Sequence, residues 1–196
     1  MSNKPETVFF FTPSMRVTQH FLWKANERKK LPNGKIVGND KFQLRGFIDP
    51  EDPATAKFVG RCREAFDPSI PADQVTAAIL EAFPVNSSLK TPIAGIPETW
   101  RRLTANTQFG PVDVIDRHGG TVRESNFFPG VWAIAQVSAF PFEDEKTGAP
   151  RLAIRLSSVL LDRPDERLKF GNRPSPKQVF AGIIGGTSTV DPFAKQ

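Results

Sequence analysis

The chain has 196 residues and one cysteine, Cys62, and it carries 26 Lys and Arg against 21 Asp and Glu. This length is enough for one domain with a buried core, and a lone cysteine excludes an internal disulfide and a thiolate zinc cluster. The 18 Pro and 14 Gly predict many chain breaks, which favours a small β-rich fold with long loops over a helical bundle.

Positive charge is concentrated near the N-terminus. Residues 1–48 carry nine Lys and Arg against three Asp and Glu, whereas residues 49–98 carry four against eight. A basic domain commonly has a nucleic acid as its partner, but an ordinary charge spread explains the same numbers. Charge alone leaves these two readings open.

The first elements are short strands and a basic loop. Strands are predicted over 6–12 and 16–24, the second with Val17, Gln19, Phe21 and Trp23 on one side. The segment 24–41 holds six basic and two acidic residues around a Pro-Asn-Gly turn signal. We interpret it as a basic, mobile hairpin, with a solvated loop as the alternative.

The segment 41–48 (KFQLRGFI) alternates as a strand does. One side holds Phe42, Leu44, Gly46 and Ile48, and the other Gln43, Arg45 and Phe47. An aromatic ring beside a guanidinium suits the stacking of a nucleobase. The alternative is a half-buried strand whose outer face happens to hold an aromatic ring.

Two helices and an irregular segment are predicted next. Asp52 is a suitable N-cap and Pro53 fits the first turn of one helix, and a second apolar stripe begins near Ala72. Residues 84–106 are rich in Pro and are expected to be irregular. Within them, Trp100 beside Arg101 and Arg102 either stacks a base and neutralises a phosphate or anchors the loop to the core.

A strand and return turn over 109–122 precede a long hairpin over 127–161. In the first strand of the hairpin, small apolar residues from Val131 to Ala139 alternate with a set that includes Trp132 and Phe140. The small set suits a packed interior, although rings on one face of a barrel can also be core. In the second strand, Arg151 and Arg155 mark the outer side, since unpaired guanidinium groups are rarely buried.

No motif for catalysis is present in the sequence. It contains neither a GxxxxGK[ST] nor a strand-linked GxGxxG phosphate loop, and it has only two histidines. We expect no enzymatic activity, no cofactor and no metal. A metal-dependent nuclease would need acids such as Asp113, Asp116 and Glu143 to cluster in space.

The order of these pieces resembles a family of bacteriophage single-stranded-DNA-binding proteins with an OB-fold. It is similar to the helix-destabilising protein of podovirus replisomes. The resemblance covers about residues 40–182 and lies in four segments: KFQL leading to Asp49-Pro50, GPVDVID at 110–116, FPGVWA at 128–133 and LAIRLSSV at 152–159.

The resemblance implies a mainly β protein with α insertions: a five-stranded OB-fold barrel with long loops, one or two helices and a basic hairpin arm. Residues 1–182 would form one domain, with a basic insertion near 24–41 and a helical insertion near 50–83. Residues 183–196 would form a flexible tail. The acidic tail of the relatives, which ends in an aromatic residue, is matched only by Asp191-Pro192-Phe193, so partner recruitment by the tail is in doubt.

The implied function is sequence-independent binding and protection of single-stranded DNA in phage replication or recombination. Partners would be single-stranded DNA and phage replication or recombination proteins, without a membrane, for a cytoplasmic monomer or homodimer in the host cell. A non-catalytic structural or virion assembly protein on a β-barrel is the alternative. Phosphates would pair with Lys and Arg and bases would stack on Phe and Trp, at these candidate DNA-binding residues: Lys24, Arg28, Lys29, Lys30, Lys41, Arg45, Phe47, Trp100, Arg101, Arg102, Trp132, Arg151 and Arg155.

Overall fold

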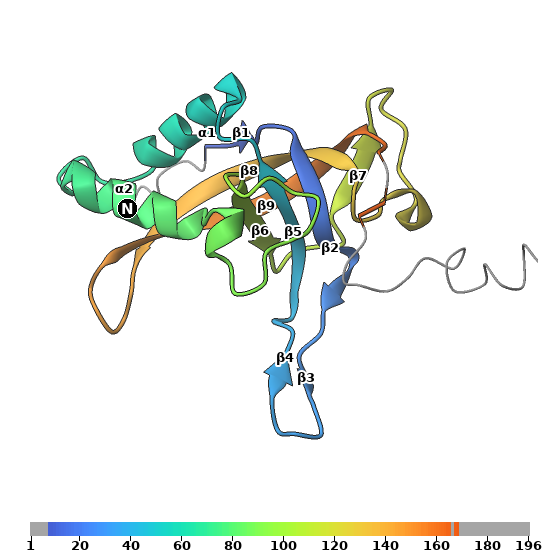
Figure 1. Ribbon diagram of the computed structural model, residues 1–196, viewed down its shortest axis with the longest axis horizontal. Helices are drawn as coiled ribbons and strands as arrows, with labels where there is room; N and C mark the ends of the chain where they lie inside the picture. Colours follow the sequence, from blue (N-terminus) through green and yellow to red (C-terminus); the bar gives the residue numbers. More distant parts are fainter. Residues whose placement is uncertain (1–7, 166, 169–196) are drawn as a thin grey trace, which may run out of the picture.

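The computed structural model describes residues 8–165 and 167–168. This part of the chain forms nine strands, two α-helices and two short 3-10 helices (Figure 1). Their bounds are β1 (Phe10–Phe11), β2 (Met15–Asn26), β3 (Lys29–Lys30), β4 (Ile36–Val37), β5 (Lys41–Ile48), α1 (Pro53–Glu64), α2 (Ala72–Ala82), η1 (Asn86–Ser88), β6 (Arg101–Thr107), β7 (Asp113–Asp116), η2 (Glu124–Asn126), β8 (Trp132–Glu143) and β9 (Pro150–Arg163).

Five strands close into a barrel. They follow the order β8-β2-β5-β6-β9, and β9 returns to pair with β8, while β1 and β7 add to the edges. Closure depends on the start of β2, where Met15 pairs with Ala133 and Arg16 pairs with Trp132. This is the arrangement of an OB-fold, and it confirms the predicted fold class of a mainly β protein with α insertions.

The long hairpin of β8 and β9 supplies much of the barrel interior. The small set of the predicted alternation points inward, since Val131, Ala133, Ala135 and Val137 are all completely buried. The larger set faces outward. Small side chains allow opposite walls of the barrel to pack closely. The alternation in the sequence therefore predicts which face of this hairpin lies inside the barrel.

Both helices pack into the same hydrophobic core as the barrel, α1 beside β1 and α2 beside β9 (Figure 1). The first helix begins as predicted: the Asp52 side chain accepts a hydrogen bond of 2.8 Å from the backbone N–H of Ala54, and Pro53 starts the first turn. Burial raises the pKa of the Cys62 thiol to about 12. Cys62 therefore serves as a small apolar core residue.

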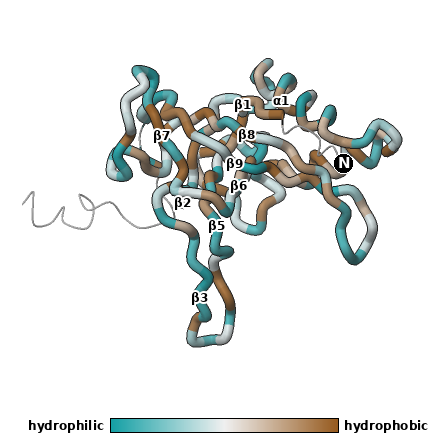
Figure 2. Tube along the Cα trace, turned by 180° about the vertical axis from the view of Figure 1, so that it is seen from behind, coloured by the Kyte–Doolittle hydropathy of each residue, from teal (hydrophilic) through white to brown (hydrophobic). Residues whose placement is uncertain are grey.

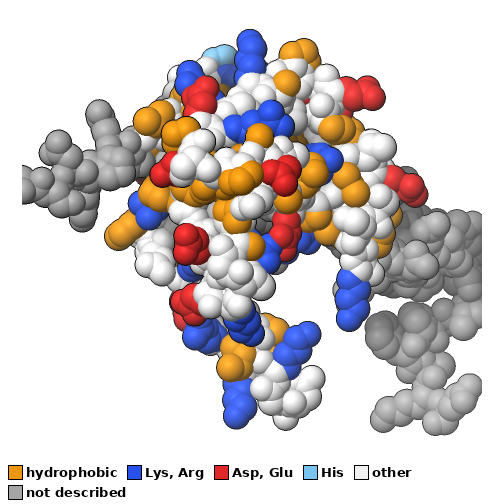
Figure 3. All heavy atoms as spheres, turned by 90° about the vertical axis from the view of Figure 1, so that its left-hand side faces the viewer, with side chains coloured by type: hydrophobic (Ala, Val, Ile, Leu, Met, Phe, Trp, Pro, Cys, Tyr) orange, Lys and Arg blue, Asp and Glu red, His pale blue; other side chains and the backbone are white. Residues whose placement is uncertain are grey.

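The predicted basic hairpin is present and projects from the barrel beyond β2 and β5 (Figure 1). We call residues 27–40 the arm. Hydrophobic segments concentrate in the barrel and the arm is mostly hydrophilic, with a hydrophobic stretch at β4 (Figure 2). Lys and Arg side chains gather at the end of this projection (Figure 3).

Two sequence predictions need correction. Residues 84–106 are not irregular throughout, because β6 occupies 101–107 and lies between β5 and β9 in the sheet. Among described residues, the strand predicted over 6–12 is limited to two residues of β1. The predicted tail over 183–196 lies outside the described residues.

Within the part of the chain that the structure describes, no helix is long and apolar enough to cross a membrane. No group of three or more His, Cys, Asp or Glu in residues 8–165 and 167–168 is placed to hold a metal ion. Asp113 is the first and Asp116 the last residue of β7, whereas Glu143 is the last residue of β8.

Candidate nucleic-acid interface

Strand register builds one row of cations and rings across the outside of the barrel. From β9 to β6, direct cross-strand partners join Arg163 to Trp132, Trp132 to Arg16, Arg16 to Phe47 and Phe47 to Arg102. Directly paired residues lie on the same face of a sheet. The row therefore alternates guanidinium and aromatic groups over all five barrel strands.

Trp132 is the most elaborately surrounded member of this row. The guanidinium of Arg163 lies 4.5 Å and that of Arg16 lies 5.7 Å from its ring centroid. Trp100 meets it edge-on at 5.8 Å, and its indole N–H donates a hydrogen bond of 2.7 Å to Asp165. Arg16 also forms an ion pair with Asp165. Two of the predicted residues, Trp100 and Trp132, are thus brought into one cluster.

A polar network continues the face beside the row. Arg45 pairs with Gln19 and Thr104 across the strands, and its Nη1 donates a hydrogen bond of 2.8 Å to Gln19. Gln43 donates one of 2.6 Å to Asn106. These amides hold the side chains of the face in fixed positions.

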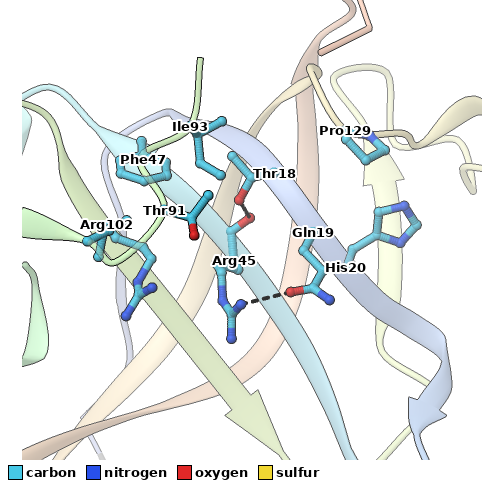
Figure 4. A pocket seen from close by; sticks show the side chains of 10 residues that line it. Thr18, Gln19, His20, Arg45, Phe47, Thr91, Ile93, Arg102 and Pro129 are labelled. Atoms are coloured by element: carbon cyan, nitrogen blue, oxygen red, sulfur yellow. Dashed lines mark hydrogen bonds between the residues drawn. The ribbon is translucent and has the colours of Figure 1, made fainter. Parts of the chain in front are cut away.

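Phe47 lies on this outer face and is nevertheless completely buried. We call residues 89–99, between η1 and β6, the strap. Thr91 and Ile93 of the strap lie beside the Phe47 ring (Figure 4). The ring was predicted to be a stacking platform, and the described structure instead places it beneath a loop.

Asn86 holds the strap in place. It is almost completely buried, and its Nδ2 donates hydrogen bonds of 3.1 and 3.0 Å to the carbonyls of Ile93 and Ile96. Its Oδ1 accepts a hydrogen bond of 2.8 Å from the Ile93 N–H. Buried polar groups of a loop must be satisfied in this way, so the strap has a defined path.

A groove of about 530 Å³ lies between the strap and the barrel (Figure 4). The strap forms one wall, His20 and Pro129 form the other, and Arg45 and Arg102 project into it. This mixture of apolar walls and a few cationic or amide groups is typical of a ligand-binding groove.

The electrostatics of the groove favour an anion. Among the described residues, neither Arg45 nor Arg102 forms an ion pair. Burial lowers the pKa of Arg45, and the charge of Arg102 lowers it further. Two neighbouring cations without a carboxylate are suited to a phosphate, which a guanidinium binds through two parallel hydrogen bonds.

The basic arm is partly neutralised by its own acids. Glu27 accepts ion pairs from Lys24 at 3.0 Å and from Lys29 at 3.7 Å, and Arg28 lies 3.5 Å from Asp40. Two more of the predicted DNA-binding residues lie in or next to the arm. Lys30, in β3, forms no ion pair with a described residue, and Lys41 is the first residue of β5.

Three predicted arginines lie away from the groove. Arg151 forms ion pairs with Glu81 and with Asp144 near α2, and Arg101 donates a hydrogen bond of 3.0 Å to the carbonyl of Phe83. Arg155 is the cross-strand partner of Asn106, and its guanidinium lies 4.0 Å from the ring centroid of Phe140.

Sequence reasoning missed part of the face for two physical reasons. A β-bulge between Val17 and Gln19 changes which side the later residues of β2 occupy, so these two residues do not share a side as predicted. The unrecognised strand β6 hid Thr104 and Asn106. Alternation of buried Leu103 and Ala105 with these polar residues was the available signal.

The closed order of the five strands places the chain in the OB-fold class, and its outer face alternates cations and aromatic rings. Among known proteins, only comparisons of structure find relatives of this fold. No family model matches the sequence, and no curated protein matches it significantly.

Solved structures of phage proteins have this fold. The single-stranded DNA-binding protein from bacteriophage Enc34 aligns with a TM-score of 0.55 at 12% identity, over 85% of this chain and 87% of its own. The same protein in complex with single-stranded DNA gives 0.51 at 15% identity, over 83% and 89%. The single-stranded DNA-binding protein gp2.5 of bacteriophage T7 gives 0.51 at 12% identity, over 97% and 99%. The predicted resemblance to phage single-stranded-DNA-binding proteins is thereby confirmed in the fold.

Proposed function

We propose that this protein binds single-stranded DNA without sequence preference and coats it during phage replication or recombination. The observation that carries this proposal is the Arg163–Trp132–Arg16–Phe47–Arg102 row, together with the groove beside it. Cations track the phosphates, while the half-buried ring of Trp132 stacks bases of any identity, because every base has a π-face.

The row favours a single strand over a duplex. Stacking needs bases that are unpaired and splayed out, and paired bases keep their faces inside the helix. The likeness to a solved structure that contains single-stranded DNA supports the same choice. Phage replication or recombination proteins are the further partners, and the role itself is binding without catalysis.

A fluorescence anisotropy titration with labelled oligo-dT tests the proposal. Binding is expected at low salt and must weaken linearly with the logarithm of salt concentration, because bound cations release the counterions of the strand. Absence of binding at low salt, or binding unaffected by salt, would overturn the proposal.

A matched pair of variants of β8 locates the interface. Trp132→Ala removes a ring of the row, and loss of one stacked base, about 1–3 kcal/mol, weakens binding about 5- to 150-fold. Phe142→Ala removes an exposed ring at the opposite end of the same strand and is expected to leave affinity unchanged. Equal effects of the two variants would mean that the DNA does not bind at the Trp132 end of β8.

A further inference from the structure

The groove beneath the strap contains an arginine whose hydrogen bonding is incomplete. Arg45 donates to Gln19 at 2.8 Å and at the limiting distance of 3.5 Å to Gln43. Its Nε is buried and has no hydrogen-bond partner among the residues that the structure describes, so this donor is unused there. A buried donor without an acceptor is unfavourable, so Arg45 has hydrogen-bonding capacity left for an acceptor bound beside it.

Arg102 adds a second reason to expect an anionic acceptor. It lines the same groove as Arg45 (Figure 4), and its charge disfavours the charged form of Arg45. An anion between the two guanidiniums would offset their repulsion and supply acceptors for both. A phosphodiester has one negative charge and two unbridged oxygens, which suits this pair.

The remaining surfaces of the groove suit a nucleobase. Leu89 and Ile93 of the strap line the groove with apolar side chains, and Pro129 lies across the groove from Ile93 (Figure 4). Phe47 lines the same groove. A volume of about 530 Å³ accommodates one nucleotide between the walls.

The strap wall exists before any ligand arrives. The three hydrogen bonds of Asn86 join the strap to η1, and Ile96 is buried as a further anchor. A wall that is already ordered loses little conformational entropy on binding, which increases affinity.

We propose that the groove beneath the strap is a preformed subsite for a single nucleotide of the bound strand. Its phosphate lies on Arg45 and Arg102, its base packs against Leu89 and Ile93, and Asn86 is the positioning residue of the wall. This inference rests on the proposed function and adds to it one discrete site in a face that is otherwise continuous.

The test uses the 5′-phosphorylated dinucleotide pTpT, which is too short to follow the row or to reach the arm at the same time. Titration of the full chain, followed by amide NMR shifts, is expected to show saturable changes in the strap and around Arg45. Arg45→Gln and Arg102→Gln each remove a charge-assisted contact, and each should weaken pTpT about tenfold or more.

Lys30→Gln is the matched control for charge. It removes one exposed cation of the arm and is expected to weaken oligo-dT while leaving the pTpT affinity unchanged. Oligo-dT binding with no saturable pTpT shifts in the strap would overturn the subsite and leave the proposed function intact. Failure to bind oligo-dT at all would instead remove the proposed function.

The role of Asn86 is tested separately. Asn86→Ala should speed hydrogen exchange of the Ile93 amide and weaken pTpT, and Asn126→Ala, a change of an exposed asparagine in η2, should do neither. Faster exchange with unchanged pTpT affinity would show that the strap is not a wall of the subsite.

Discussion

At the scale of single residues, Phe47 shows how a loop changes what a strand pattern means. Alternation along β5 places its ring outside the barrel, between Arg16 and Arg102. The strap then covers it, and full burial of such a ring stabilises a fold by about 1.5–3 kcal/mol. Phe47 therefore anchors the strap, and the exposed part of the row lies toward Trp132.

Burial of His20 makes the stability of the fold depend on pH in a predictable direction. It packs against Trp23 and Phe127 with ring centroids 5.8 and 5.1 Å away. Burial lowers the pKa of His20 below its ordinary value of 6.5, although Glu124 and a hydrogen bond to the Phe127 backbone act in the opposite direction. The unfolded chain consequently takes up a proton more readily than the folded one. Stability from His20 is complete above pH 6.5 and falls as the pH drops through the range below it, down to the folded-state pKa.

Urea unfolding of the chain at a series of pH values on both sides of this range measures the effect. In His20→Gln the acid-side loss of unfolding free energy should shrink, whereas His118→Gln, a change of an exposed turn residue, should retain it. An identical acid-side loss in the wild type and His20→Gln would contradict the prediction.

At the scale of elements, the sequence predicts those whose pattern is local and complete. The N-cap of α1 is confirmed because Asp52 is a local capping signal next to Pro53. The strand β5 and the β8–β9 hairpin are confirmed because their own segments alternate as strands do. The strand β6 was not predicted, because Pro-rich residues precede it and its outward side is polar. Its strand state comes from pairing with β5, which is tertiary context.

The candidate site was predictable only in part for a related reason. Arg45, Arg102 and Trp132 could be selected as residue types suited to DNA. That Arg16 lies between Trp132 and Phe47 is a consequence of register between β8, β2 and β5, which no single segment encodes. The ion pairs that occupy Arg151 likewise come from α2 and the hairpin turn.

The arm yields a prediction about salt dependence. Glu27 and Asp40 already pair with Lys24, Lys29 and Arg28, whereas Lys30 and Lys35 form no ion pair with a described residue. We expect Lys30 and Lys35 to contact phosphates more strongly than the paired cations do.

In the double variant Lys30→Gln, Lys35→Gln, the slope of log affinity for oligo-dT against log salt should therefore decrease by about 0.7 per lost contact, or about 1.4 in total. The control is Lys57→Gln, Lys146→Gln, which removes the same charge from α1 and the β8–β9 turn. Equal slopes for the two double variants would mean that net charge, and not the arm, determines the salt dependence.

At the scale of the whole molecule, the row ties the proposed DNA binding to the integrity of the barrel. It takes one residue from each of the five closed strands, so no partly unfolded sheet preserves it. A ligand that binds only the folded state stabilises it by RT ln(1 + [L]/Kd), about 2.7 kcal/mol at one hundred times Kd.

For a chain of this size, oligo-dT at that concentration should raise the unfolding midpoint by about 5–10 °C, measured by circular dichroism at low salt. The increase should shrink at high salt, because phosphate contacts weaken there, and it should be smaller for Trp132→Ala than for Phe142→Ala at one fixed DNA concentration. The midpoint could stay unchanged under conditions where anisotropy shows saturation. The DNA would then also bind the unfolded chain, or it would bind the arm alone, whether or not the barrel is folded. In either case the row would not be the interface.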